Sequence, residues 1–412
     1  MLALPWEVPI IRPCAGLPLG NGSIPEIPVT KDQLPEDAVP PRRALSRWTL
    51  WIFRLILVAM ILGLLELAGY VLMEVMLPSR YRVAREILLG TSETEAMKSQ
   101  KVVGHPYLTY IATPGYLSSE GELQHNQDGY RGRLVPLDRT PKTLRILCLG
   151  GSTTYGSGVA QADQTYPAHL ERLLANDLPP GWEGVEVLNG GVPHGTSAEM
   201  LTHYHFKYRY YRPDVAILNT GGNDAEALAY PHYSPDYSHW RQNLQTLRPL
   251  PAHSRWIVRS RIGAMFVLAL FYSDQVSGGH LLRTTGKPPT AHWYRRSDGG
   301  REQKIGDADL AFRANVEALV RMLRQDGVKV LLVPFRPSPV RGGEYREFLL
   351  AQMARNEAIL RELADKYDTG FAPFPAEAIS RENWVDPCHL NGPGCLEKAR
   401  HIAPFVHEIA AR

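Results

Sequence analysis

A serine in a glycine-rich turn is the first residue of this sequence whose surroundings indicate chemistry. The stretch 145–149, apolar from Ile146 onward, runs directly into Gly150-Gly151-Ser152. Short apolar runs bounded by glycines are typical of buried parallel strands, and open α/β sheets bind their ligands beyond the carboxyl ends of such strands. The turn therefore predicts an exposed hydroxyl at the edge of a sheet. On this stretch alone, a nucleophilic serine competes with a phosphate-binding turn and with an ordinary strand–helix connection.

The sequence also holds a base and an acid that suit this serine. Near the carboxyl end, Asp386 and His389 are separated by two residues. A serine hydroxyl is a poor nucleophile until a neighbouring base removes its proton. An aspartate within one turn of the histidine can hold the imidazole in one tautomer and stabilise the imidazolium. An isolated Asp-x-x-His pair is more often surface polarity, but its position after the last predicted strand favours Ser152 as nucleophile, His389 as base and Asp386 as the orienting acid.

Alternating strand and helix patterns must position these residues. This alternation predicts a three-layer α/β/α fold with a doubly wound, flavodoxin-like parallel sheet and helices on both faces. The predicted strands cover residues 186–189, 215–219 and 328–334 besides the serine strand, and the predicted helices cover residues 162–175, 307–325 and 344–367.

Two further motifs follow the serine turn at intervals of about one helix. The first is Asn189-Gly190-Gly191, and the second is the stretch 221–224, Gly-Gly-Asn-Asp. Serine turn, Asn-x-Gly, Gly-x-Asn-Asp and Asp-x-x-His, in this order, resemble the SGNH (GDSL-type) hydrolase family. The resemblance extends from about Leu144 to the carboxyl terminus.

The resemblance implies an oxyanion hole besides the triad. Its donors would be the backbone N–H groups of Ser152 and Gly191 and the side-chain amide of Asn223, while Asn189 and Asp224 would brace the loops. Glycine at position 191 would let the backbone approach the substrate closely. The family's usual Gly-Asp-Ser is Gly-Gly-Ser in this sequence, so the acidic residue before the nucleophile is replaced by Gly151.

Composition narrows the classes of partner. The 412 residues carry a formal net charge of +3, which gives no general case for nucleic-acid binding. The four cysteines are too few for a disulfide scaffold and lack paired zinc spacing, so we expect neither metal nor cofactor. Cys388 and Cys395 flank His389, and a disulfide between them would fix this loop in an oxidising compartment.

The amino-terminal part predicts a membrane anchor. Residues 1–44 are rich in proline and predict a disordered tail, and residues 45–77 predict a single transmembrane helix that contacts the membrane through residues 48–76. Arginines before the span favour a cytoplasmic amino terminus and a periplasmic or extracytoplasmic catalytic domain at the inner membrane. Glu66 lies inside the span, where it would snorkel, be protonated or make a contact between helices.

The rest of the chain divides into a lead-in and a catalytic domain. Residues 78–140 predict a polar lead-in, in which Arg131 would form a structural salt bridge or reach an anionic substrate. Residues 141–412 predict the SGNH hydrolase-like domain with an insertion at about 225–306. Within this insertion, the apolar run 262–272 predicts a core or interfacial helix behind a basic flank, and the aromatic, basic stretch 292–296 would line a sugar-binding cleft or form a surface loop.

Together these features predict a membrane-anchored serine esterase or acyl hydrolase. Its substrate would carry a carbohydrate or lipid acyl ester. An O-acyltransferase acting on a cell-envelope polysaccharide would use the same acyl-enzyme with a sugar hydroxyl in place of water. The alternative to an enzyme is a non-catalytic subunit of a membrane complex, which would dock through the tail and the transmembrane helix.

Overall fold

The computed structural model describes residues 46–77, 79–91, 101–118, 122, 124–230, 233–240, 249–272, 310–339 and 344–412. The predicted tail at 1–44 and the aromatic, basic stretch 292–296 lie outside these residues.

A parallel sheet of five strands carries the catalytic part of the chain. Its spatial order is β4-β3-β5-β6-β7, and every neighbouring pair is parallel. This is the flavodoxin-like order, in which the connections reverse direction beside the first strand. The predicted doubly wound sheet is therefore confirmed. The strands are β3 (Thr143–Gly150), β4 (Gly184–Gly191), β5 (Val215–Thr220), β6 (Lys329–Pro334) and β7 (Gly370–Phe371).

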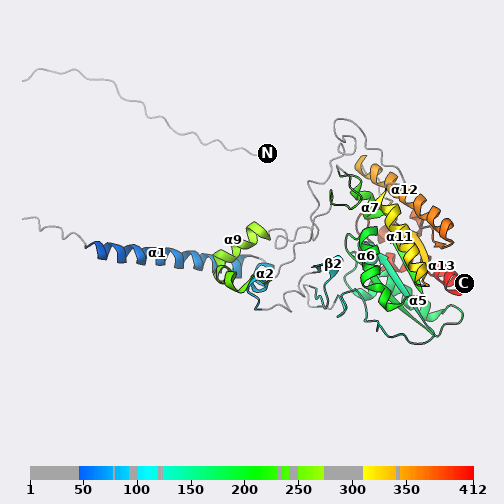
Figure 1. The fold of residues 1–412 in the computed structure, drawn as a ribbon, viewed down its shortest axis with the longest axis horizontal. Helices are drawn as coiled ribbons and strands as arrows, with labels where there is room; N and C mark the ends of the chain where they lie inside the picture. Colours follow the sequence, from blue (N-terminus) through cyan, green and yellow to red (C-terminus); the bar gives the residue numbers. More distant parts are fainter. Residues whose placement is uncertain are drawn as a thin grey trace, which may run out of the picture. The chain divides into compact units, whose positions relative to one another are not determined.

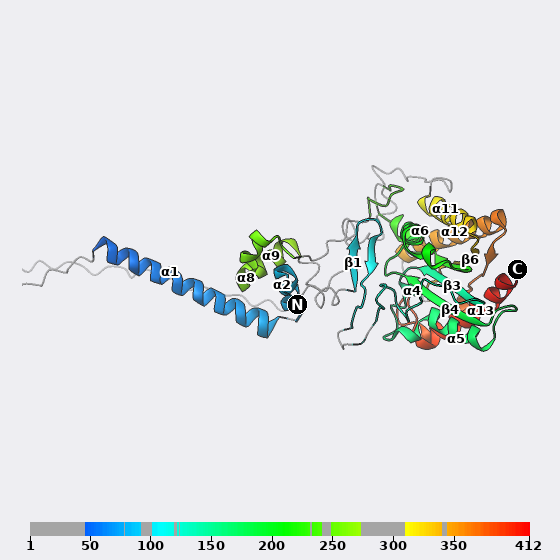
Figure 2. The same ribbon diagram turned by 60° about the horizontal axis from the view of Figure 1, so that its bottom comes forward.

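Helices cover both faces of this sheet (Figure 1). Successive side chains of β3 point to opposite faces, so Ile146 and Cys148 belong to one hydrophobic core while Leu147 and Leu149 belong to the other. Figure 2 shows α6, α11 and α12 on one side and α5 and α13 on the other. These helices are α5 (Tyr166–Asn176), α6 (Ser197–Phe206), α11 (Ala311–Gln325), α12 (Glu344–Tyr367) and α13 (Gly392–Ala411).

Short helices connect these elements. They are α4 (Ser152–Tyr155), η2 (Ala162–Gln164), η3 (Tyr208–Tyr211), α7 (Gly222–Ala227), η4 (Ala252–Ser254), η6 (Ala376–Ala378) and η7 (Arg381–Asn383). The helix predicted for 162–175 is divided into η2 and α5.

The lead-in packs against the catalytic part instead of remaining a polar connector. It forms an antiparallel hairpin of β1 (Val102–His105) and β2 (Thr109–Ala112). Tyr110 is fully buried and donates its hydroxyl to the Pro193 carbonyl at 2.7 Å. The buried His203 ring of α6 lies 2.9 Å from the Tyr110 carbonyl. The hairpin is therefore fixed to the loop after β4 and to α6.

One described helix is long and apolar enough to cross a membrane. It covers Arg47–Met76 and comprises α1 (Arg47–Tyr70) with the π-helical turn η1 (Val71–Met76). Its side chains are largely exposed. Length and composition are the evidence for a span, and a signal sequence would meet the same criteria.

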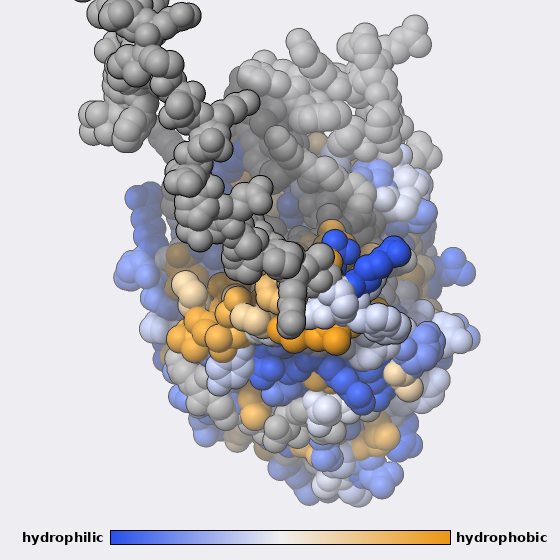
Figure 3. All heavy atoms as spheres, turned by 90° about the vertical axis from the view of Figure 1, so that its left-hand side faces the viewer, coloured by the Kyte–Doolittle hydropathy of each residue, from blue (hydrophilic) through white to orange (hydrophobic). Residues whose placement is uncertain are grey.

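A second, small core lies at the end of this helix. Met73 of η1 packs with residues of α2 (Ser79–Leu89), α8 (Arg255–Arg259) and α9 (Arg261–Phe271). The apolar run at 262–272 is thus a helix, as predicted. Glu66 accepts hydrogen bonds from the Ser260 hydroxyl and the Arg261 N–H, both at 2.7 Å, which is the helix contact considered for it. We call these elements the second helical cluster. Figure 3 shows one face of the molecule, on which hydrophobic residues (orange) lie next to hydrophilic ones (blue).

Candidate active site

The serine turn forms where β3 passes into α4. Ser152 is the first residue of this one-turn helix and is partly buried. A Cβ atom at Gly150 would lie 2.1 Å from the Thr154 hydroxyl oxygen and 2.8 Å from the Asn219 carbonyl oxygen, so only glycine fits there. The turn lies at the carboxyl end of β3, beside the point where the order of the strands reverses. Ligands of this fold bind at that point.

Ser152, His389 and Asp386 are brought together from opposite ends of the domain. The His389 Nε2 atom lies 2.8 Å from the Ser152 hydroxyl oxygen, and its Nδ1 atom lies 2.6 Å from a carboxylate oxygen of Asp386. The other oxygen of Asp386 accepts the backbone N–H groups of Cys388 and His389, each at 2.8 Å. The backbone of this loop therefore holds the carboxylate against the imidazole.

The hydrogen bonds keep Asp386 ionised. Partial burial opposes the charge, but the bonds from the His389 ring and from the two N–H groups outweigh it and lower the pKa of Asp386 to about 2. The side chain of His389 is 19% exposed and that of Asp386 is 42% exposed. The arrangement places an accepting carboxylate on one ring nitrogen and a hydroxyl on the other, so His389 can take the proton of Ser152 while the carboxylate stabilises its charged form.

Asn223 approaches the serine turn from the next strand. It lies in α7, and its side-chain amide donates to the Gly195 carbonyl at 2.8 Å. The same nitrogen lies 2.7 Å from where a Cβ of Gly151 would be. One amide hydrogen is used by Gly195, so the second can point to a group bound at Ser152. The Ser152 N–H donates to no acceptor among the described residues.

Asp224 holds the loop that positions Asn223. Its carboxylate is buried and accepts the Ser197 N–H at 3.1 Å and the Ser197 hydroxyl at 2.5 Å. The Tyr237 hydroxyl donates to it at 2.7 Å. Burial raises the pKa of Asp224, and these hydrogen bonds oppose the shift. The bracing role expected for Asp224 agrees with these contacts.

Gly191 does not offer a free donor. Its N–H lies 3.1 Å from the side-chain oxygen of Asn189, which accepts it. A Cβ at Gly191 would lie 2.2 Å from the Tyr155 backbone nitrogen, so glycine is required by close packing of β4 against α4. Because this N–H already has an acceptor, Gly191 is not among the oxyanion-hole donors that we propose for this chain.

Two residues that support the serine turn were missed as functional residues in the sequence. The side-chain oxygen of Asn219 accepts the Thr153 hydroxyl at 3.2 Å and the Lys398 ammonium at 2.7 Å. Lys398 is buried, and burial lowers its pKa to about 8. The only signal in the sequence was the asparagine at the end of β5, because nothing marks a lysine of the last helix as buried.

Arg131 pairs with no carboxylate of the described residues. Its guanidinium is buried and donates to the carbonyls of Gly156 at 2.5 Å, Val159 at 2.9 Å and Ala160 at 2.8 Å. The predicted salt bridge is therefore not found among the described residues, and the buried guanidinium is occupied by backbone carbonyls. Arg131 instead holds the loop that follows α4.

The predicted disulfide is also wrong. Cys388 and Cys395 are free thiols, with the Cys388 sulfur 3.4 Å from His389 Nδ1 and Cys395 buried in the first turn of α13. Among the described residues, Asp386, Cys388 and His389 are the group whose donor atoms lie close enough for a metal ion. Burial and the charge of Asp386 raise the pKa of Cys388 to about 12, so this thiol is protonated beside the His389 ring.

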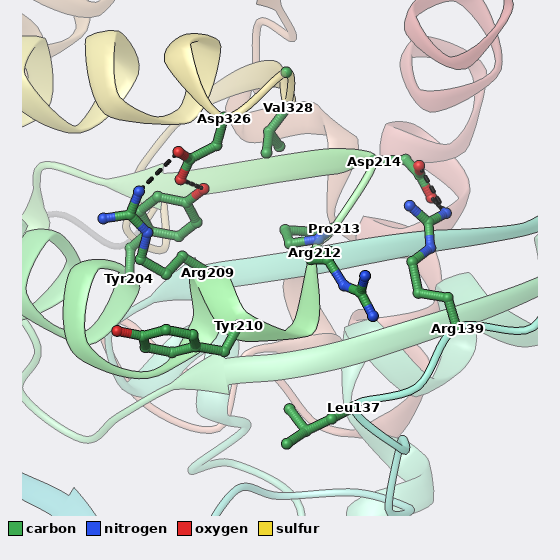
Figure 4. Close-up of a pocket in the computed structure, with 11 residues that line it drawn as sticks. Leu137, Arg139, Tyr204, Arg209, Tyr210, Arg212, Pro213, Asp214, Asp326 and Val328 are labelled. Carbon is green, nitrogen blue, oxygen red and sulfur yellow. Dashed lines mark hydrogen bonds and ion pairs between the residues drawn. The ribbon is translucent and has the colours of Figure 1, made fainter.

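A surface pocket lies at the other end of the sheet. Its lining includes Pro213 and Asp214, just before β5, and Val328, just before β6 (Figure 4). Ion pairs cross it, including Arg139 with Asp214 at 2.7 Å. Ser152 lies at the carboxyl end of β3, where the candidate active site is, so this pocket is separate from that site.

Residues 148–395 match the model of the GDSL-like lipase/acylhydrolase family. No curated protein matches the sequence. Solved structures with similarity include TesA (15% identity, covering 64% of this chain and 99% of that chain, TM-score 0.38). They also include a lipase/acylhydrolase from Enterococcus faecalis (14%, 64% and 96%, TM-score 0.38) and Axe2, an acetylxylan esterase from Geobacillus stearothermophilus (13%, 64% and 94%, TM-score 0.36). These values are too low to indicate a substrate for this chain.

Proposed function

Because this chain belongs to the GDSL-like lipase/acylhydrolase family and is an ester-cleaving hydrolase, we propose that Ser152, His389 and Asp386 are its catalytic triad. The observation that carries the proposal is the pair of hydrogen bonds on the His389 ring, 2.8 Å to Ser152 and 2.6 Å to Asp386. Both lie within the reach needed for proton transfer and for orientation of the base.

The first half of the reaction forms an acyl-enzyme. His389 Nε2 takes the proton of Ser152 as the serine oxygen attacks the ester carbonyl, and Asp386 stabilises the imidazolium. His389 then protonates the departing alcohol as the carbon–oxygen bond breaks. In the second half, His389 activates a water that attacks the acyl-serine, and the carboxylic acid leaves as Ser152 recovers its proton.

The negative oxygen of the tetrahedral intermediate requires donors. We propose the Ser152 N–H and the second amide hydrogen of Asn223 for this task. Both lie at the serine turn, and the bonds from Asn223 to Gly195 and from Ser197 to Asp224 support the amide in position. Removing one such donor commonly lowers kcat by about 10²–10³.

We also propose that the helix Arg47–Met76 anchors the enzyme in a membrane, with the amino terminus in the cytoplasm and the catalytic domain outside it. The basic residues before the span support this orientation. The substrate would then be a lipid or carbohydrate acyl ester of the cell envelope.

The test uses the full chain in detergent. We expect the wild type to hydrolyse p-nitrophenyl acetate and to react with a fluorophosphonate probe, and Ser152→Ala to lose both. Ser157→Ala, in the loop that follows α4, is the matched control and should keep both. Equal activity in Ser152→Ala and wild type would refute the proposed nucleophile, and a folded but inactive wild type would favour the non-catalytic alternative.

A further inference from the structure

The helix α9 has two apolar faces, and the described residues cover only one of them. Ala264, Val267 and Leu268 are buried in the second helical cluster. Phe266 is 64% exposed and Leu270 is 59% exposed, on the outer face of the same helix. Residues 262–271 contain no charged residue. A helix that is apolar all round is normally surrounded by apolar material, so the outer face requires a covering partner.

This outer face is joined to the end of the candidate span. The Ser260 hydroxyl and the Arg261 N–H, at the start of α9, donate to Glu66 of α1 at 2.7 Å. A Cβ at Gly69 would lie 3.0 Å from the Ile262 side chain, so the two helices are in close contact there. The Arg261 guanidinium also lies 4.7 Å from the Tyr70 ring centroid. The first turn of α9 is therefore packed against the last turns of α1.

The length of α1 indicates the depth at which this contact lies. The helix rises about 1.5 Å per residue, so the segment from Arg47 to Glu66 measures about 29 Å, close to the ~30 Å of a bilayer hydrocarbon core. If Trp48 lies at one interface, Glu66 lies at the other. The helix α9 begins at that level and has 11 residues, too few to cross a bilayer.

The side chains next to the apolar stretch of α9 are of the kinds that bind a phospholipid surface. Arg255 and Arg259 precede the apolar stretch, and the exposed Trp256 lies between them, while Arg261 pairs with Glu66 and Glu74. Basic residues beside an exposed aromatic and aliphatic face are typical of helices that lie in the plane of a membrane interface.

We propose that α8 and α9, residues 255–271, form an in-plane membrane element whose partner is the phospholipid leaflet where α1 leaves the bilayer. The outer face of α9 enters the lipid, and its first turn is held to the anchor through Glu66. This inference rests on the proposed membrane insertion of α1 and is independent of the catalytic proposal.

The test places a photoreactive benzoylphenylalanine at single positions of the full chain. The protein is reconstituted in vesicles of phosphatidylcholine and phosphatidylglycerol and irradiated, and adducts are identified by mass. Position 266 tests the inference, Leu57 tests the span, and Tyr210, 62% exposed on η3, is the matched aromatic control. We expect phospholipid adducts at 57 and 266 and none at 210.

Each other outcome overturns the inference in a distinguishable way. Lipid at 57 but not at 266 leaves the anchor and refutes the in-plane element, while no lipid at either position refutes both. A cross-link from 266 to a second copy, or to another segment of the same chain, identifies a protein as the partner of α9.

Unmodified protein irradiated with a diazirine phosphatidylcholine provides a test without substitution, since peptides within 255–271 should be labelled. Hydrolysis of p-nitrophenyl acetate by each sample reports separately on the catalytic proposal.

Discussion

Gly151 is the position at which the geometry of the site can be tested most directly. A methyl group at this position would have its carbon 2.7 Å from the Asn223 amide nitrogen and 3.1 Å from the Gly195 carbonyl oxygen. The backbone is extended, with φ −83° and ψ −151°, so alanine can adopt it without strain. Gly151→Ala should therefore act through the new side chain, while the fold is maintained.

The size of the effect follows from these distances. Non-bonded atoms rarely approach within about 3.4 Å, so the amide of Asn223 must retreat by about 0.7 Å or turn away. Its hydrogen bond to Gly195, 2.8 Å long, would be weakened, and the amide would leave the position proposed for the oxyanion. A displacement near 1 Å can cost about 10² in rate, and loss of a whole donor about 10²–10³. We expect kcat to fall by about 10² or more.

The assay is kcat for p-nitrophenyl acetate, measured with the unfolding midpoint of each variant. Gly184→Ala is the matched control, because a Cβ there lies at an ordinary 3.4 Å from the Thr143 hydroxyl oxygen at the far end of the sheet. Combining Gly151→Ala with Asn223→Ala should be no slower than Asn223→Ala alone. Wild-type kcat in Gly151→Ala, or full additivity in the double variant, would refute the proposed role of Asn223.

Three further predictions concern the triad, pH and stability. Asp386→Asn should keep the fold and lower kcat by about 10⁴, because the amide favours the wrong tautomer of the base; a drop below tenfold would contradict the triad. Burial, reinforced by the charge of Lys207, lowers the pKa of His203 to about 4. Between pH 6.5 and 4, His203 therefore binds a proton in the unfolded chain but not in the folded one. The free energy of unfolding falls as the pH is lowered through this window, by up to about 3 kcal/mol. The difference in urea unfolding between wild type and His203→Gln should shrink as the pH falls from 7 to 4, and a constant difference would argue against a neutral buried ring. Arg131→Met should lower the unfolding free energy by about 3 kcal/mol or more, since several buried carbonyls lose their donor, and an unchanged urea midpoint would refute this.

Much of the fold was predictable because local patterns and global packing agree. The helix 344–367 was predicted with its observed bounds, and the strands at 186–189, 215–219 and 328–334 lie at β4, β5 and β6. Their apolar residues are buried on both faces, which leaves continuous apolar runs in the sequence. The members of the proposed triad could be picked out for another reason: Ser152 directly follows a recognisable strand, and Asp386 and His389 lie in the loop before the last helix.

The missed features depend on contacts between distant residues. The N–H of Gly191 is engaged by Asn189, and no pattern in the sequence reveals how a side chain turns back on its own strand. The buried contacts of Arg131 were not predictable because its partners are carbonyls, which every residue carries. The strands β1 and β2 have four residues each, too few for a clear alternation.

The hairpin of the lead-in has a practical consequence for anyone who truncates this protein. A recombinant fragment begun at residue 141, where the sequence predicts the catalytic domain to start, would lack Tyr110 and the partner carbonyls of His203. It would also leave the Tyr155 hydroxyl without His125, which lies 2.8 Å from it directly behind the serine turn. Such a fragment would expose apolar surface and aggregate. A soluble, crystallisable form of this enzyme should begin before Lys101, so that the hairpin is retained.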